Sequence, residues 1–72
     1  MVFDMATMAA RIRGKRAELN LTQEDLAERI DVSPDLISKY ESAVHRPGSD
    51  KLFALAQALD TTPNYLLGWD DS

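Results

Sequence analysis

The sequence predicts an all-α fold in which five short helices surround one core and the second and third helices form a helix-turn-helix. Two capping residues, Thr22 and Ser33, each precede a short segment with helical apolar spacing. Only Asp31 and Val32 separate the first of these segments from the second cap, so the two helices must meet at a steep angle. No segment alternates apolar and polar residues as a half-buried strand does. A chain of 72 residues holds one domain at most, and we expect it over residues 1–72.

The first helix is expected from about Thr7 to Glu18. Apolar residues at helical spacing define its inward face: Met5, Met8, Ala9, Ile12 and Leu19. Basic residues occupy its outer face: Arg11, Arg13, Lys15 and Arg16.

The helix-turn-helix is expected at about residues 22–41. Thr22 is a good N-cap and Asp25 follows three residues later, as in a capping box, so the second helix starts at Gln23. The third helix starts at Pro34, because proline suits the first helical position. The residues expected in the core are Leu26, Ala27 and Ile30 from the second helix, and Leu36 or Ile37 together with Tyr40 from the third.

The fourth helix follows a loop marked by Pro47 and Gly48. Ser49 is expected to be its N-cap, with Asp50 favourable in the first turn. Its apolar stripe consists of Leu52, Leu55, Ala56 and Leu59.

The fifth helix is short. Thr62 and Pro63 start it, and Gly68 is placed to end it. We expect the tail, residues 68–72, to be the start of a linker.

The composition excludes several classes of function. The chain has no cysteine and a single histidine in a loop, and it lacks a glycine-rich phosphate loop and metal-ligand spacing. We therefore expect no enzyme, no catalytic residue, no metal, no cofactor and no small-molecule substrate. The N-terminus lacks the pattern of a signal peptide and no apolar run is long enough to span a membrane, which favours a cytoplasmic protein.

The net charge is unusual for a nucleic-acid binder. It is −4, with a pI near 4.7. However, basic residues follow the third helix as well as lining the first: His45, Arg46 and Lys51. Acidic residues gather on the second helix: Glu24, Asp25 and Glu28. A basic face on an acidic body predicts weak and salt-dependent binding, and an ordinary solvated face is the alternative.

Several motifs together resemble the lambdoid phage repressor and Cro family, of the Cro/cI type (XRE-like). They cover nearly the whole chain in this order: LTQEDLAERI, a short turn, ISKYE, a loop ending in RP, LFALAQALD and TPNYLL. The resemblance implies a compact five-helix lambda-repressor-like domain. It also implies a sequence-specific transcriptional regulator, either the N-terminal domain of a phage-type repressor or a Cro-like protein. Such a protein binds operator half-sites of double-stranded DNA as a dimer, in the cytoplasm of a bacterial host and on the nucleoid when bound.

The resemblance also implies residue roles. The base contacts fall on the third helix, at Pro34, Asp35, Ser38 and Lys39. Lys39 suits a guanine, whereas Asp35 could accept from a cytosine N4 or serve the dipole of its own helix. The phosphate contacts are Arg11, Arg13, Arg16, Gln23, Ser33, His45, Arg46 and Lys51. Arg16 and Glu41 match a structural ion pair, and Asp31 and Ala43 stand where relatives often have a left-handed glycine.

Two alternatives stay open at the end of the chain. Leu67 and Trp69 form either a surface for weak homodimerisation or part of the core. The rival function is a protein-interaction module of the same fold, an antitoxin or adaptor, which would use the acidic second helix and this C-terminal apolar surface.

Overall fold

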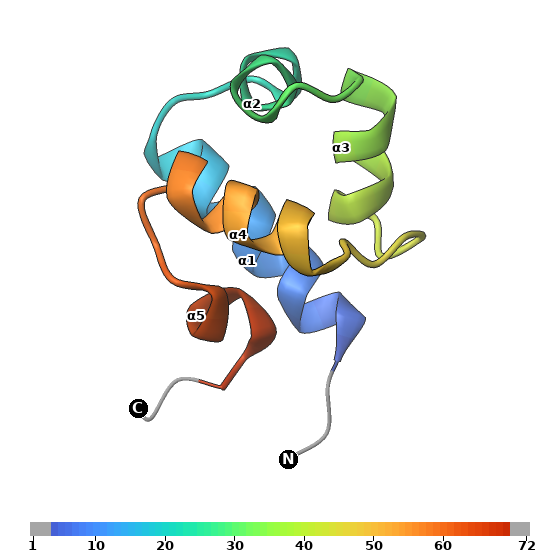
Figure 1. The fold of residues 1–72 in the computed structure, drawn as a ribbon, viewed down its shortest axis with the longest axis vertical. Coiled ribbons are helices and arrows are strands. Elements are labelled where there is room, and N and C mark those ends of the chain that lie inside the picture. Colours follow the sequence, from blue (N-terminus) through green and yellow to red (C-terminus); the bar gives the residue numbers. More distant parts are fainter. Residues whose placement is uncertain (1–3, 70–72) are drawn as a thin grey trace.

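Five helices make up the fold of this computed structural model, which describes residues 4–69 (Figure 1). They are α1 (Met5–Glu18), α2 (Gln23–Ile30), α3 (Pro34–Glu41), α4 (Ser49–Ala58) and α5 (Pro63–Leu67). Within these described residues there is no strand, so the predicted all-α fold is confirmed. Asp70, Asp71 and Ser72 of the expected tail lie outside the described residues.

The helix-turn-helix begins and turns where the capping residues predict. The Thr22 hydroxyl accepts from the Asp25 backbone N–H at 3.0 Å, and the Asp25 carboxylate accepts from the Thr22 N–H at 2.9 Å, which completes the capping box. The Ser33 hydroxyl accepts from the Leu36 N–H at 3.2 Å and so caps α3. Between the two helices, Asp31 ends α2 in the left-handed conformation with φ 60°.

Two helix starts differ from the prediction. α1 begins at Met5 rather than Thr7, because the Asp4 carboxylate accepts from the Ala6 N–H at 3.0 Å and is the true cap. α4 begins at Ser49 and is capped by Gly48, which offers no side chain. The Gly48 carbonyl already accepts from the Leu52 N–H at 2.8 Å, so the helix starts one residue earlier than expected.

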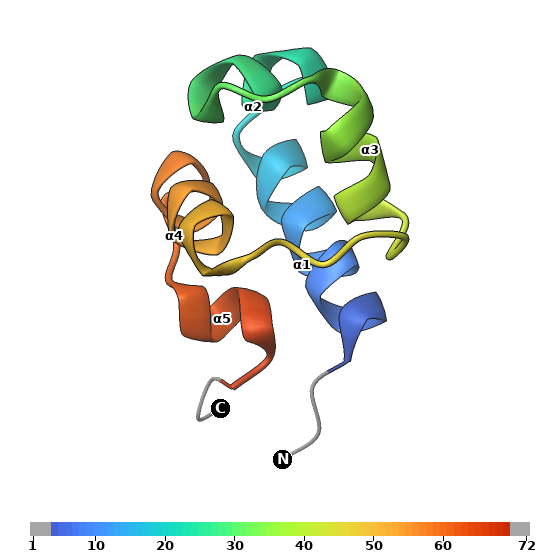
Figure 2. The same cartoon turned by 45° about the vertical axis from the view of Figure 1, so that its right-hand side comes forward.

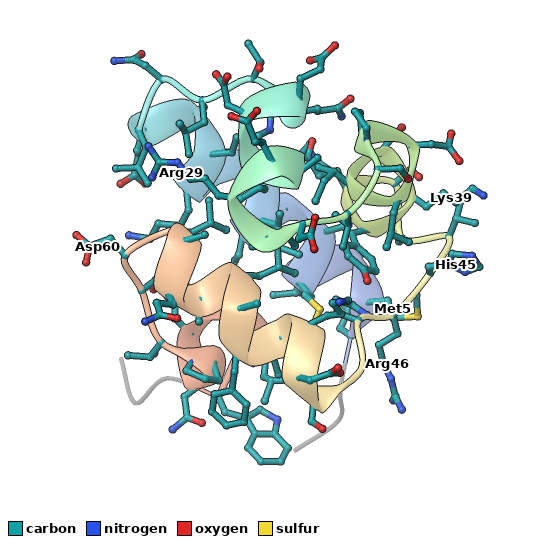
Figure 3. The ribbon with its side chains drawn as sticks, turned by 45° about the horizontal axis from the view of Figure 1, so that its top comes forward. Met5, Arg29, Lys39, His45, Arg46 and Asp60 are labelled. Atoms are coloured by element: carbon teal, nitrogen blue, oxygen red, sulfur yellow. The ribbon has the colours of Figure 1, made fainter. Side chains whose placement is uncertain are left out.

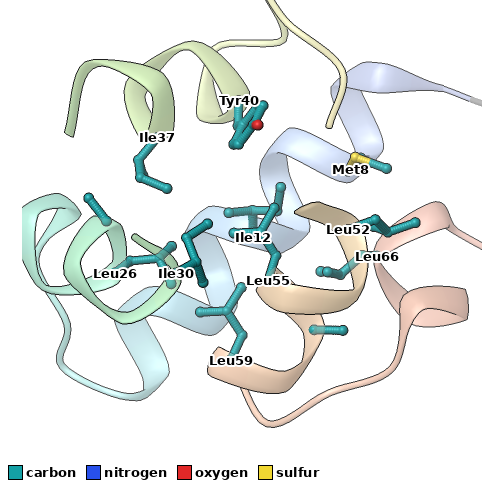
Figure 4. Close-up of a cluster of buried hydrophobic side chains, with 12 residues drawn as sticks. Met8, Ile12, Leu26, Ile30, Ile37, Tyr40, Leu52, Leu55, Leu59 and Leu66 are labelled. Atoms are coloured by element: carbon teal, nitrogen blue, oxygen red, sulfur yellow. The ribbon is translucent and has the colours of Figure 1, made fainter. Parts of the chain in front are cut away.

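The core lies between all five helices (Figure 4). Its largest fully buried side chains are Ile12, Leu26, Ile37, Leu55, Leu59 and Leu66. Of the two alternatives on α3, Ile37 is the core residue and Leu36 is half-buried. The expected inward position of Leu19 is wrong, because α1 ends at Glu18 and Leu19 is 39% exposed.

The packing order places α3 at one edge of the molecule. α3 packs against α2 and α1, while α1 also packs against α5, and α4 packs against α2 and α5. Two views show α3 along the right-hand edge, with α5 and the start of α1 at the end opposite α2 (Figures 1 and 2). One face of α3 is therefore left uncovered. Among residues 4–69, no helix has the length and apolar character needed to cross a membrane.

Candidate nucleic-acid interface

The uncovered face of α3 carries the residues that the resemblance assigned to base contacts. Pro34, Asp35 and Ser38 are exposed and Lys39 is half-buried, with 45% of its side chain accessible. The opposite face of the same helix is buried through Ile37, Tyr40 and Glu41. This division follows from the apolar spacing of the helix, because residues three and four apart share a face. A polar surface one helix wide is thereby presented to solvent.

Two of these residues form an ion pair. The Lys39 ammonium lies 3.2 Å from Asp35 Oδ2, one helical turn earlier. Solvent reaches both side chains, 45% of Lys39 and 76% of Asp35, so the pair contributes little to stability. Figure 3 shows Lys39 directed away from the body of the molecule. The pair leaves this part of the α3 surface with no net charge.

A buried carboxylate fixes the position of α3. Glu41 is only 4% exposed and accepts from Arg16 Nε at 2.6 Å and from Arg16 Nη2 at 3.0 Å. It also accepts from the Gln23 amide at 3.1 Å, which joins the first residue of α2 to the last residue of α3. Arg16 Nη1 donates in addition to the Leu21 carbonyl at 2.8 Å. Three helices are thus locked together around one side chain.

This arrangement stabilises the protonated form of Arg16. Its hydrogen bond to the Glu41 carboxylate raises the pKa of Arg16, an effect that burial opposes and the charges of Glu41 and Glu24 reinforce. Arg13 donates a further hydrogen bond to the Glu41 carbonyl at the end of α3. Arg13 and Arg16 of α1 therefore help to hold α3 in position.

The structure divides the residues assigned to phosphate contacts into separate groups. Arg13, Arg16 and Gln23 converge on Glu41, as the bonds above describe. Ser33 is exposed and its hydroxyl caps α3. His45 and Arg46 are exposed in the loop after α3, and Lys51 is half-buried on α4. That loop is tied to α3, because the Val44 and His45 N–H groups both donate to the Lys39 carbonyl, at 2.9 and 3.3 Å.

Arg11 lies apart from this set. Its Nη1 donates to the Tyr65 carbonyl at 2.8 Å, and its guanidinium carbon lies 4.5 Å from the centre of the Tyr65 ring. The Lys15 ammonium lies 5.0 Å from the same ring centre, so two cations hold α5 against α1. This role of Tyr65 was not predicted from the sequence. The available signal was that Arg11 and Lys15 are four residues apart and so share one helix face.

The loop after α3 places its basic residues on the same side as Lys39. In Figure 3, Lys39, His45 and Arg46 lie along one edge, whereas Arg29 and Asp60 lie at the opposite edge. Ala43 gives this loop its turn by adopting φ 62°, which places it, like Asp31, in the left-handed conformation expected from the resemblance. The exposed polar residues of α3 and the basic residues of the following loop therefore lie on one side of the molecule, with the exposed Val44 between them.

The C-terminal apolar residues are divided between core and surface. Leu67 is half-buried against the core, whereas Trp69 is 48% exposed. Over residues 4–69 the structure has no pocket and no group of His, Asp and Glu residues placed to hold a metal ion.

Comparisons with known proteins agree with this architecture. The family model HTH_3, described as Helix-turn-helix, matches residues 12–66. Repressor protein C2 of Salmonella phage P22 is 38% identical over 88% of the chain, which spans 29% of that protein. The HTH-type transcriptional regulator DicA of Escherichia coli is 34% identical over 90% of the chain, which spans 48% of that protein. The chain thus spans half or less of the length of these two relatives.

A solved structure gives the same result in three dimensions. The crystal structure of the P22 c2 repressor protein in complex with the synthetic operator 9T has a TM-score of 0.84 to this fold. The similarity covers 88% of this chain and 96% of that one, at 38% sequence identity. The family match, the relatives and this structural similarity together show that the chain belongs to the helix-turn-helix family HTH_3, among the Cro/cI-type domains of phage repressors and bacterial regulators.

Proposed function

We propose that this protein is a sequence-specific DNA-binding transcriptional regulator whose α3 enters the major groove of an operator. The observation that carries the proposal is the uncovered α3 face, with Asp35, Ser38 and Lys39 directed outward while Glu41 fixes the helix from behind. A helix presented in this way fits the width of the major groove. A related protein of the same fold has been crystallised on a synthetic operator, which supports this role.

The phosphate contacts are proposed for the residues that flank α3. The loop after α3 offers His45 and Arg46, and α4 offers Lys51. The N-terminus of α2 offers Gln23, whose amide bonds Glu41 at the C-terminal end of α3, and backbone N–H groups that lack partners within the helix. Both groups are anchored to the C-terminal end of α3, so phosphate contacts there can hold the register of the helix while α3 contacts base edges.

We further propose that the chain pairs weakly with a second copy when it binds DNA, through the surface at Trp69. Trp69 is 48% exposed directly after α5, next to the half-buried Leu67. A two-fold pair would match a palindromic operator. The Trp69→Ala variant should therefore weaken the dimer constant obtained by sedimentation, and Phe53→Ala is the control because Phe53 is also exposed but on α4. An unchanged constant for Trp69→Ala removes this residue from the interface.

Selection from a random duplex library at several salt concentrations tests the main proposal. We expect enrichment of a palindromic motif and an affinity that falls steeply with salt. Arg46→Gln should weaken all sequences alike and reduce the salt slope by about one, because it removes one phosphate contact. Arg29→Gln is the matched control, since it removes the same charge from an exposed residue at the opposite edge.

Absence of any enriched sequence, even at low salt, would contradict the proposal. That outcome would favour a protein-interaction module instead. The exposed acidic residues of α2, Glu24, Asp25 and Glu28, would then be the first surface to test for a protein partner.

A further inference from the structure

We propose that Asp35 and Lys39 act as a single unit that recognises one G·C base pair, an inference that rests on the proposed function. The two side chains belong to the uncovered face of α3 and form an ion pair of 3.2 Å. Side-chain accessibility is 76% for Asp35 and 45% for Lys39, so the pair is open to a ligand without rearrangement of the core.

The geometry of the pair matches the major-groove edge of a base pair. Guanine O6 and cytosine N4 are joined by a Watson–Crick hydrogen bond, so they lie about 2.9 Å apart. The Lys39 ammonium and the Asp35 carboxylate offer a donor and an acceptor at nearly the same separation, 3.2 Å. The ammonium can therefore donate to O6 while the carboxylate accepts the second proton of N4.

The atoms on either side of this central pair select G·C over A·T. An A·T pair also offers a neighbouring donor and acceptor, adenine N6 and thymine O4. It would, however, place the acceptor N7 beside the Asp35 carboxylate and the thymine methyl beside the Lys39 ammonium. In a G·C pair the acceptor N7 lies beside the ammonium, and the carboxylate lies beside the cytosine C5–H. A G·C pair is thus complementary to the two side chains at all four positions. The order of Asp35 and Lys39 along α3 determines which strand carries the guanine.

The ion pair also explains how a carboxylate can approach DNA. A lone Asp35 would be repelled by the phosphates on both sides of the groove. Lys39 cancels this charge, so the two residues enter the groove as a pair with no net charge that offers one donor and one acceptor. The pair therefore favours sequence recognition over general attraction to the phosphate backbone.

Selection from a duplex library with variants of the two residues tests the inference. We expect Asp35→Ala and Lys39→Ala each to reduce preference at the same G·C position, by roughly 5- to 100-fold. The exchange variant Asp35→Lys/Lys39→Asp should reverse the preference to C·G at that position. Glu18→Ala is the matched control, because it removes the same charge from an exposed member of an ion pair on α1 and should change no preference.

A modified base provides a second measurement. N4-methylcytosine at the selected position replaces the major-groove proton of N4, so it should weaken binding of the unmodified protein by a similar factor. The same modification should have little effect on Asp35→Ala, which has no acceptor to lose.

The outcomes separate this inference from the proposed function. Suppose an operator is enriched, but the two single variants alter two different positions or weaken all sequences alike. The single-unit inference is then overturned while the regulator proposal stands. If the unmodified protein enriches no sequence, the regulator proposal fails and this inference fails with it.

Discussion

Removal of the buried Glu41 carboxylate is the most informative stability test of this fold. The side chain is only 3% exposed and accepts three hydrogen bonds, two from Arg16 and one from Gln23. Breaking a buried ion pair by removing one partner costs about 3 to 5 kcal/mol. The Arg16 side chain is 21% exposed and can recover some hydration, so we expect Glu41→Ala to lose about 3 kcal/mol, near the lower limit of that range.

A loss of this size is large for such a small domain. Typical stabilities per residue give a total of roughly 4 to 11 kcal/mol for a chain of this length. The same loss corresponds to a fall in Tm of about 12 to 24 °C. Urea unfolding followed by far-ultraviolet circular dichroism measures the free energy, because the native signal comes from the five helices.

A double-mutant cycle separates the ion pair from other effects of truncation. Arg16→Met leaves the Glu41 carboxylate buried without its partner, so it should lose about 4 kcal/mol. The double variant Arg16→Met/Glu41→Ala removes both charges and should lose less than the sum of the single losses, with a coupling energy of about 2 kcal/mol. A loss below about 1 kcal/mol for Glu41→Ala, or a coupling energy below about 0.5 kcal/mol, would refute a structural role for the pair.

Three further changes test the local structure by the same unfolding measurement. Ala43→Gly should stabilise the protein by about 1 kcal/mol, because Ala43 holds the left-handed φ of 62° at a steric cost that glycine avoids; a loss of stability would contradict this. Leu55→Ala should lose about 3 kcal/mol, since the side chain is fully buried and its removal leaves a cavity; a loss under 1 kcal/mol would show that the core collapses around the gap. Hydrogen bonds from the backbone and hydroxyl of Thr22 lower the pKa of Asp25, so its contribution is present above about pH 4 and is lost as the pH falls through the folded value. Asp25→Asn should therefore lose less stability between pH 5 and pH 2 than the unmodified protein, and an equal loss would remove Asp25 from the acid transition.

The helix-turn-helix was predictable because its determinants are local. The Thr22, Asp25 and Ser33 caps each bond a residue three positions away, so a short window of sequence contains both partners. The two wrong helix starts arose at the N-termini of α1 and α4, where the observed cap lies upstream of the expected start. At α1 the carboxylate of Asp4 captures the N-terminus before Thr7 is reached, and at α4 the backbone of Gly48 does so before Ser49.

The site was less predictable because its key contacts join distant parts of the chain. Arg16 and Glu41 are 25 residues apart, and the family resemblance, not the local pattern, paired them. The contact between Arg11 and Tyr65 spans 54 residues and leaves no local signal beyond the shared helix face of Arg11 and Lys15. The ion pair of Asp35 and Lys39 has the spacing of helix neighbours, but that spacing alone does not reveal that both side chains remain accessible.

The acidic character of the chain has a consequence for how it would recognise DNA. With a net charge of −4, the protein as a whole is repelled by the duplex, so the long-range field cannot supply its affinity. The charges of α3 are cancelled by ion pairs: Lys39 pairs with Asp35 within the helix, and Glu41 pairs with Arg16 of α1. Binding must then depend on contacts at close range: the cations of the loop after α3 for the phosphates, and the α3 surface for the bases. Such a protein should bind non-specific DNA weakly, and its selectivity should decrease less than its affinity as salt rises, because neutral base contacts release few counterions.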